Sequence, residues 1–95
     1  MNFYKFTEKA QEAVLTAQQL AEQMSHAQIE PEHLLLALVE QSEGIVPEIL
    51  RKMDVDPKPF AAALREELSR LPQAYGGAQP PMSQRFRKVA DEAQA

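Results

Sequence analysis

No cysteine occurs anywhere in this sequence. Disulfides, thiolate metal ligands and thiol nucleophiles are therefore excluded, and a small domain that folds without them fits a reducing compartment, so we expect a cytoplasmic location. The opening segment MNFYKFTEKA lacks the continuous apolar core of a signal peptide, and no apolar run approaches the roughly 20 residues that span a bilayer. We expect neither secretion nor a membrane partner.

An excess of basic residues is also missing. Ten Lys and Arg stand against 14 Asp and Glu, which gives a formal net charge of −4. Binding to the nucleic-acid backbone depends on clustered cations, so nucleic acid is not expected as a partner. Arg85, Arg87 and Lys88 come nearest to a basic patch, but Asp91 and Glu92 follow them, and we expect a solvated helix face.

Motifs that carry catalysis are absent as well. The sequence has no GxxxxGK[ST] phosphate loop, no GxSxG elbow and no carboxylate pair in a marked cleft. His26 and His33 flank the start of a helix that also holds Glu32, but the HExxH spacing and a third ligand are missing, so we expect structural histidines. The chain is predicted to be no enzyme and to bind no metal or cofactor itself.

What the sequence does contain is helical periodicity. An apolar fraction of 44% with 25% charged residues is ordinary for one small globular domain. We predict an all-α fold, a four-helix repeat plus a fifth helix, with helices at about 7–24, 31–41, 45–53, 57–70 and 84–95. Thr7 is predicted to cap the first helix, whose apolar stripe is rich in alanine and lets the second helix approach closely.

The second helix is the predicted centre of the fold. Six consecutive apolar residues, Leu34 to Val39, follow Pro31, Glu32 and His33. A helix that is apolar on every side must be enclosed by others, so we predict that it is buried all round. Pro31 suits the first helical position, and Glu32 favours the positive end of the helix.

The later helices are predicted from their apolar spacing. Ile45, Val46, Ile49, Leu50 and Met53 define the third, and Pro47 is tolerated because it falls in the first turn. Asp56 and Pro57 open the fourth, whose stripe is read as Phe60, Leu64, Leu68 and Leu71. Met24, Met53 and Met82 are expected to fill gaps in the core.

A weak internal repeat divides the chain. The glycine- and proline-rich residues 72–82 are predicted to be a linker, and Ser83 caps a new helix. A shift of 76 positions aligns Thr7 with Ser83 and Ala17-Gln18 with Ala93-Gln94. We therefore expect a first repeat at 1–71 and the first helix of an incomplete second repeat at 83–95.

Two places are candidate binding sites. At the first site, two aromatic residues lie close to a predicted helix cap, namely Phe3 and Phe6 beside Thr7. We predict a weak, sequence-tolerant site there for extended apolar polypeptide. The alternative is that the aromatic residues belong to the core and that Thr7 is only a cap. Glu32 is read either as a solvated first-turn carboxylate or as an anion that pairs with a cationic group on a partner.

Taken in order, the segments FTEKAQEAVLTAQQLAEQ, His26 with Ile29, PEHLLLALVEQ, EGIVPEIL, and a linker that opens with Leu71-Pro72 and holds Gly76-Gly77 resemble one family over essentially the whole chain. The chain resembles the N-terminal domain of the Clp family of AAA+ unfoldases, of the ClpB disaggregase type. Domains of that family carry two copies of a four-helix repeat, so the resemblance implies a first copy and part of a second.

The resemblance also implies a function. It implies a mobile domain above a homohexameric ATP-driven ring, which engages unfolded or aggregated polypeptides and passes them to the pore, while ATP and Mg²⁺ act in modules outside this chain. Thr7 matches a threonine linked to substrate handling, and Glu32 matches a partner-contacting position of ClpC-type members that recognise phosphorylated arginine. The alternatives are an adaptor-docking domain of a protease-coupled Clp ATPase and a purely structural role in assembly.

Overall fold

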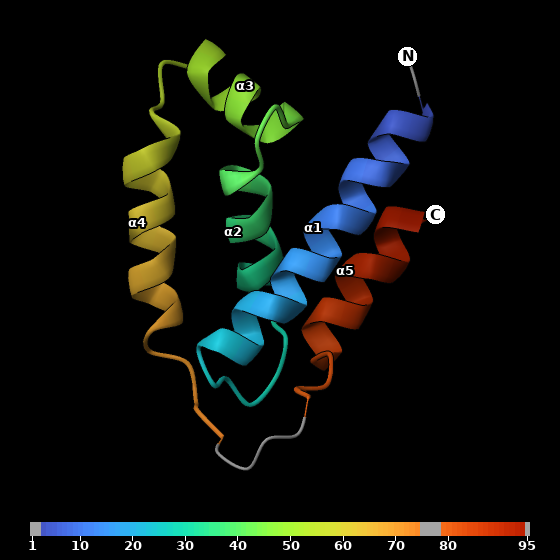
Figure 1. Cartoon of the computed structure of the whole chain (residues 1–95), viewed down its shortest axis with the longest axis vertical. Helices are drawn as coiled ribbons and strands as arrows, with labels where there is room; N and C mark the ends of the chain where they lie inside the picture. The colour runs from blue at the N-terminus through green and yellow to red at the C-terminus, as the bar shows by residue number, and fades with distance from the viewer. Residues whose placement is uncertain (1–2, 75–78, 95) are drawn as a thin grey trace.

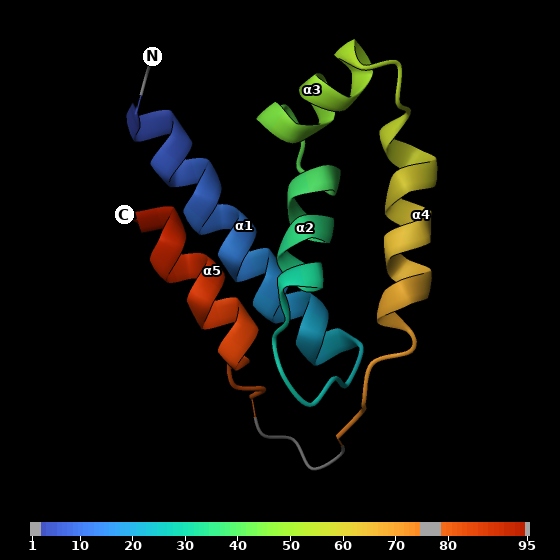
Figure 2. The same cartoon turned by 180° about the vertical axis from the view of Figure 1, so that it is seen from behind.

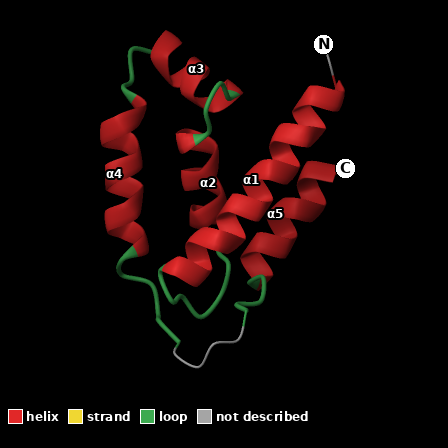
Figure 3. Ribbon diagram, viewed as in Figure 1, coloured by secondary structure: helices red, strands yellow, loops and turns green. Residues whose placement is uncertain are grey.

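The computed structural model describes the backbone of residues 3–74 and 79–94, and the side-chain surroundings of residues 8–74, 79–89, 91 and 92. Over the described backbone the chain forms five helices and no strand (Figures 1 and 3). The helices are α1 (Phe3–Gln23), α2 (Pro31–Glu40), α3 (Ile45–Lys52), α4 (Pro57–Leu68) and α5 (Gln84–Gln94). The predicted all-α fold is confirmed.

Helix α2 lies at the centre, where it contacts each of the other four helices (Figure 2). Its side chains His33, Leu36, Ala37 and Val39 are buried. Leu35, however, is 39% exposed, so the prediction of a helix enclosed on every side is wrong on that face. Successive residues of a helix lie about 100° apart, and Leu35 therefore projects away from the face that packs against α1 and α4.

The alanine-rich face of α1 packs against two helices, α2 and α5. Ala13 joins Leu36 of α2 in the main core, as predicted, and Leu20, which the predicted stripe did not include, joins them. Ala17 and Ala21 instead join a second cluster with Phe86 of α5, whose side chain is only 2% exposed. The fifth helix thus packs on the bundle, and in both views it lies beside α1 (Figures 1 and 2).

The start of α1 differs from the prediction. The helix begins at Phe3, four positions before Thr7, so Thr7 lies inside the helix and is not its cap. Neither proline nor glycine interrupts the preceding residues, and nothing in their backbone stops the helix there. Ser83, which the repeat aligns with Thr7, does act as a cap, because its Oγ accepts a hydrogen bond of 3.0 Å from the Phe86 N–H.

Phe60, predicted to lie on the apolar stripe of the fourth helix, and Met53, predicted to fill a gap in the core, are also exposed. The buried positions of α4 are Ala61 and Leu68, so Phe60 lies off that stripe and is 37% exposed. Met53 is the C-cap that follows α3, and it is 65% exposed. Met24 and Met82 pack against the two core clusters, as predicted. The predicted start of α4 is confirmed, since the Asp56 side chain accepts a hydrogen bond from the backbone N–H of Lys58.

The predicted linker has no helix in its described parts, and both of its ends are anchored. Each end forms a pair of backbone hydrogen bonds with the connection between α1 and α2. On one side Ala27 N donates to Pro72 O (3.0 Å) and Ala74 N to Ser25 O (2.8 Å); on the other Ile29 N donates to Pro81 O (2.8 Å) and Ser83 N to Ile29 O (3.0 Å). The connection is therefore bracketed by residues about fifty positions later in the chain.

Two helices end on non-glycine residues in the left-handed region. Ser25 follows α1 with φ 56° and Asp54 follows α3 with φ 60°. In each case the next residue reaches back to the helix, His26 N to Ala21 O at 2.9 Å and Val55 N to Leu50 O at 2.8 Å. These are Schellman motifs, in which glycine is the preferred residue at the left-handed position.

Candidate functional site

Three of the four predicted site residues lie on the first turns of α1. The backbone places Phe3, Phe6 and Thr7 in that helix, but their side chains lie outside the described residues. Two hydrogen bonds locate the next turn of α1: the Lys9 ammonium donates to Ser42 O at 3.2 Å, and the Gln41 amide donates to Lys9 O at 2.9 Å. The beginning of α1 therefore lies against the turn that leads into α3.

The fourth predicted site residue, Glu32, is already paired within the chain. Its carboxylate lies 3.0 Å from the Arg85 guanidinium, which also lies 3.2 Å from Glu30. The hydrogen bond and charge of Glu32, with the charge of Glu30, raise the pKa of Arg85 above its ordinary value. The prediction that Arg85 only belongs to a solvated helix face is therefore incomplete. Its side chain is 62% exposed, but its ion pairs join the start of α5 to the start of α2.

The two histidines form a buried pair. His26 is 4% exposed and His33 is fully buried, and His26 Nδ1 lies 2.6 Å from His33 Nε2. The backbone N–H of Glu30 donates to His33 Nδ1 at 2.8 Å, so this nitrogen carries no proton and His33 Nε2 must donate to His26 Nδ1. The proton of neutral His26 then sits on Nε2, and His26 bonds to the backbone of Leu68.

This chain of hydrogen bonds requires both rings to be neutral. Burial lowers the pKa of His26, and burial together with the nearby His26 lowers the pKa of His33. The 2.6 Å separation also leaves no room for a metal between the two nitrogens, because a Zn–N bond is about 2.0 Å on each side. The geometry supports the structural role predicted for both histidines, which join the end of α4 to the start of α2.

An exposed apolar stripe runs along α3. Ile45, Ile49 and Met53 are 52%, 49% and 65% exposed, and their i, i+4, i+8 spacing places them on one side of the helix. We call these three residues the α3 ridge. Val46 and Leu50 turn toward the core instead. The sequence prediction used all five only to define the helix and did not say which of them are buried, and five apolar residues in nine positions span more of the helix than one neighbour covers.

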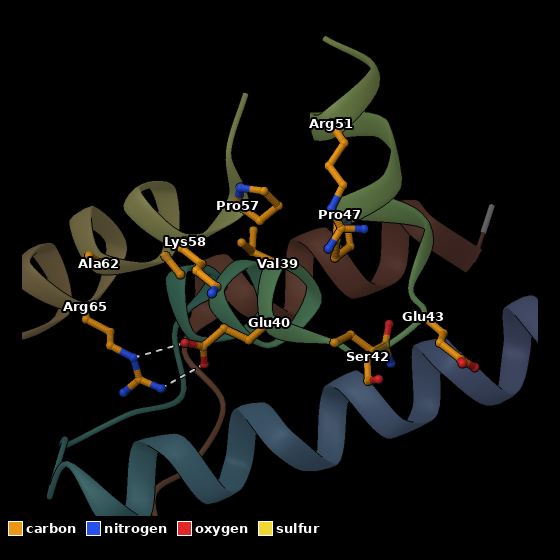
Figure 4. A pocket seen from close by; sticks show the side chains of 12 residues that line it. Val39, Glu40, Ser42, Glu43, Pro47, Arg51, Pro57, Lys58, Ala62 and Arg65 are labelled. Carbon is orange, nitrogen blue, oxygen red and sulfur yellow. Dashed lines mark hydrogen bonds and ion pairs between the residues drawn. The ribbon is translucent and has the colours of Figure 1, made fainter. Parts of the chain in front are cut away.

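A hollow opens on another side of α3. It has a volume of about 770 Å³ and lies between the end of α2, α3 and α4 (Figure 4). Its apolar lining includes Val39, Pro47 and Ala61, and its cationic lining consists of Arg51, Lys58 and Arg65. The sequence prediction did not include this site, because its residues come from separate segments and share no motif.

Other kinds of site are not found in the described part of the chain. No group of three or more His, Asp or Glu side chains there is arranged to hold a metal ion. No helix within the described ranges is long and apolar enough to cross a membrane. The α3 ridge and the hollow beside it are candidate binding sites.

The chain matches a known family over nearly its whole length. Residues 5–95 match the family model described as "Clp repeat (R) N-terminal domain". Similar proteins include a chaperone protein ClpB of Bdellovibrio bacteriovorus, 45% identical over 93 residues, and one of Nitratidesulfovibrio vulgaris, 44% identical over 81 residues. The aligned parts cover 93% and 84% of this chain but only 11% and 9% of those relatives, so the chain spans about a tenth of their length. This chain belongs to the Clp repeat N-terminal domain family.

Proposed function

We propose that this chain is the substrate-engaging N-terminal domain of a ClpB-type, ATP-dependent disaggregase. It binds exposed apolar segments of unfolded or aggregated polypeptides and passes them to a homohexameric ring. ATP and Mg²⁺ act in the ring, outside this chain. The family match and the name of the relatives, chaperone protein ClpB, support this proposal.

The observation that carries the proposal is the α3 ridge. Isolated exposed apolar side chains are common on protein surfaces, but three on consecutive turns of one short helix form a continuous apolar strip. Hydrogen bonds between Lys9 and the turn at Gln41 and Ser42 place the start of α1 beside the start of α3. The ridge and the predicted site at Phe3, Phe6 and Thr7 therefore lie at the same end of the molecule.

A binding assay tests this function. Fluorescence anisotropy with a labelled, permanently unfolded polypeptide should show weak saturable binding, which Ile49→Ser with Met53→Ser weakens. Leu15→Ser is the matched control, because Leu15 is 60% exposed but lies on the middle of α1. Phe6→Ala and Thr7→Ala test the predicted α1 site in the same assay. Binding that no variant at either place alters would contradict the proposal.

An adaptor-docking function is the second candidate, and the environment of Glu32 favours it. Two carboxylates, Glu30 and Glu32, converge on one exposed guanidinium, so a cationic group of a partner can replace Arg85 only by breaking both ion pairs. Arg85→Gln should then strengthen binding to a folded cationic partner, whereas binding of neutral unfolded chains should not change. Tight one-to-one binding of a folded adaptor would favour this function over the first.

We also propose that residues 1–71 form one repeat and that α5 corresponds to α1 of the next, with residues 72–82 between them. Phe86 and Ala10 occupy equivalent positions under the shift of 76 residues. The close packing of Phe86 on Ala17 and Ala21 supports a tight junction between the two units. A chain that ends at Leu71 should fold if the first repeat is independent, and circular dichroism would measure this directly.

A further inference from the structure

We propose that the hollow between α2, α3 and α4 is a second binding site, which takes an acidic side chain of an extended polypeptide. This inference goes beyond the proposed function, because the hollow is lined by residues separate from the α3 ridge and from the start of α1. Its occupant is identified by the charges and the apolar surface that line the hollow.

The charges of the lining are unequally satisfied. Arg65 is engaged by Glu40, with its Nη2 and Nε at 2.8 and 3.2 Å from the two carboxylate oxygens. Arg51 and Lys58 have no carboxylate within 4.0 Å in the described part of the chain. The remaining acidic residue of the lining, Glu43, lies on the turn at the rim. Two cations therefore face the hollow without an ion pair, although the chain as a whole is acidic.

The positions of the two cations favour a ligand inside the hollow. In Figure 4 the Arg51 side chain extends from α3 toward Pro47, and the Lys58 side chain extends from α4 toward Glu40, and all four residues line the hollow. Lys58 also belongs to the first turn of α4, where the helix dipole adds partial positive charge. A carboxylate placed there would gain charge-assisted hydrogen bonds from two directions.

The apolar part of the lining indicates which uncharged groups of the ligand would fit the hollow. Val39, Pro47 and Ala61 form the apolar part of the lining, and each is a buried residue that presents only a small part of its surface to the hollow. These surfaces suit the methylene groups of a glutamate or aspartate side chain whose carboxylate reaches the cations. A volume of about 770 Å³ holds more than one such side chain, so a short acidic peptide segment fits the hollow better than a single small anion.

Amide NMR spectra of the full 95-residue chain, titrated with two capped, unstructured peptides, test the site. The peptides have the same length and differ only in Glu against Gln. The Glu peptide should shift the amide signals of Glu40 to Glu43, Arg51 and Lys58, and its affinity should fall with added salt, because exposed charges are screened. Equal shifts from the Gln peptide, or no saturable shift, would overturn the proposal.

Paired variants assign the binding to the two cations. The double variant Arg51→Gln with Lys58→Gln should lower the affinity for the Glu peptide by roughly tenfold. This is the effect expected when two weak, solvent-exposed ion pairs are lost. Lys52→Gln with Lys88→Gln removes the same charge from exposed positions outside the hollow and should change the affinity less than twofold. An equal loss in both pairs would mean that net charge alone drives binding. Concentration-dependent shifts at the hollow without peptide would assign it to a second copy and overturn the proposal.

Discussion

The buried histidine pair makes the stability of this domain depend on pH in a predictable direction. Both pKa values are lowered in the folded chain, mainly by burial, so between the folded pKa and the ordinary value of about 6.5 the unfolded chain binds more protons. The contribution of the neutral histidine pair to the free energy of unfolding is therefore fully present above about pH 6.5. It decreases as the pH is lowered from that value toward the folded pKa of each ring.

The size of the effect follows from linkage. Each histidine that is protonated only in the unfolded state contributes a slope of about 1.4 kcal/mol per pH unit, and both together contribute at most about 2.7 kcal/mol per pH unit. The charge of either ring opposes protonation of the other, because the two nitrogens lie 2.6 Å apart. No other imidazole contributes, since the chain holds two histidines.

Urea unfolding followed by circular dichroism at about pH 7.2 and about pH 5.5 measures this slope, in a window above the carboxylate pKa values. The matched control is His26→Gln with His33→Gln. Glutamine does not titrate, its amide can both accept and donate, and at the position of His33 it is a natural capping-box residue. The variant should lose most of the pH dependence. A wild-type chain equally stable at both pH values would refute the reasoning about the pair.

Three further outcomes are expected from the same unfolding assay. Phe86→Ala should cost about 3–5 kcal/mol by emptying the contact between α5 and α1, whereas Val89→Ala, at a 42% exposed position of the same helix, should cost less than about 1 kcal/mol. Leu36→Ala should cost about 2–5 kcal/mol and Leu35→Ala much less, because Leu36 is fully buried and Leu35 is not; equal costs would contradict the assigned orientation of α2. Asp54→Gly should raise stability by about 1 kcal/mol, because glycine adopts the positive φ of 60° without strain; an unchanged midpoint would mean that the aspartate is not strained there.

The sequence predicted the helices well because their start signals are local. Pro31 and Pro57 open α2 and α4 as expected, and Asp56 caps α4. Thr7 failed as a start signal because a cap residue also fits inside a helix when nothing stops the preceding residues. A local pattern therefore marks where a helix can begin better than where it must begin.

Predicting which face of a helix is buried was less successful, because burial depends on neighbours that the periodicity does not identify. The apolar run of α2 gave no reason to separate Leu35 from Leu36, yet only Leu36 faces α1 and α4. The same limit applies to Met53 and Phe60, which are apolar residues at helical spacing but lie off the covered side.

The contacts that define the candidate sites join segments far apart in the chain. Arg85 pairs with Glu30 and Glu32 across more than fifty residues, and no spacing rule connects them. The cations of the hollow come from α3 and α4 and meet only after these helices fold. The predicted site at Phe3, Phe6 and Thr7 stays a prediction, since those side chains lie outside the described residues.

The backbone hydrogen bonds that hold the α1–α2 connection between residues 72–74 and 81–83 imply that this connection is completed late in folding. Contacts within the helices are local and form early, but the backbone groups of Ala27 and Ile29 acquire their partners only when Pro72 and Pro81 arrive. During synthesis from the N-terminus, the connection beside the histidine pair therefore stays open to water until residues near Ser83 have emerged. Residues 72–83 thus complete a structure that starts about fifty positions earlier, and variants that slow their arrival should prolong exposure of the alanine-rich face of α1.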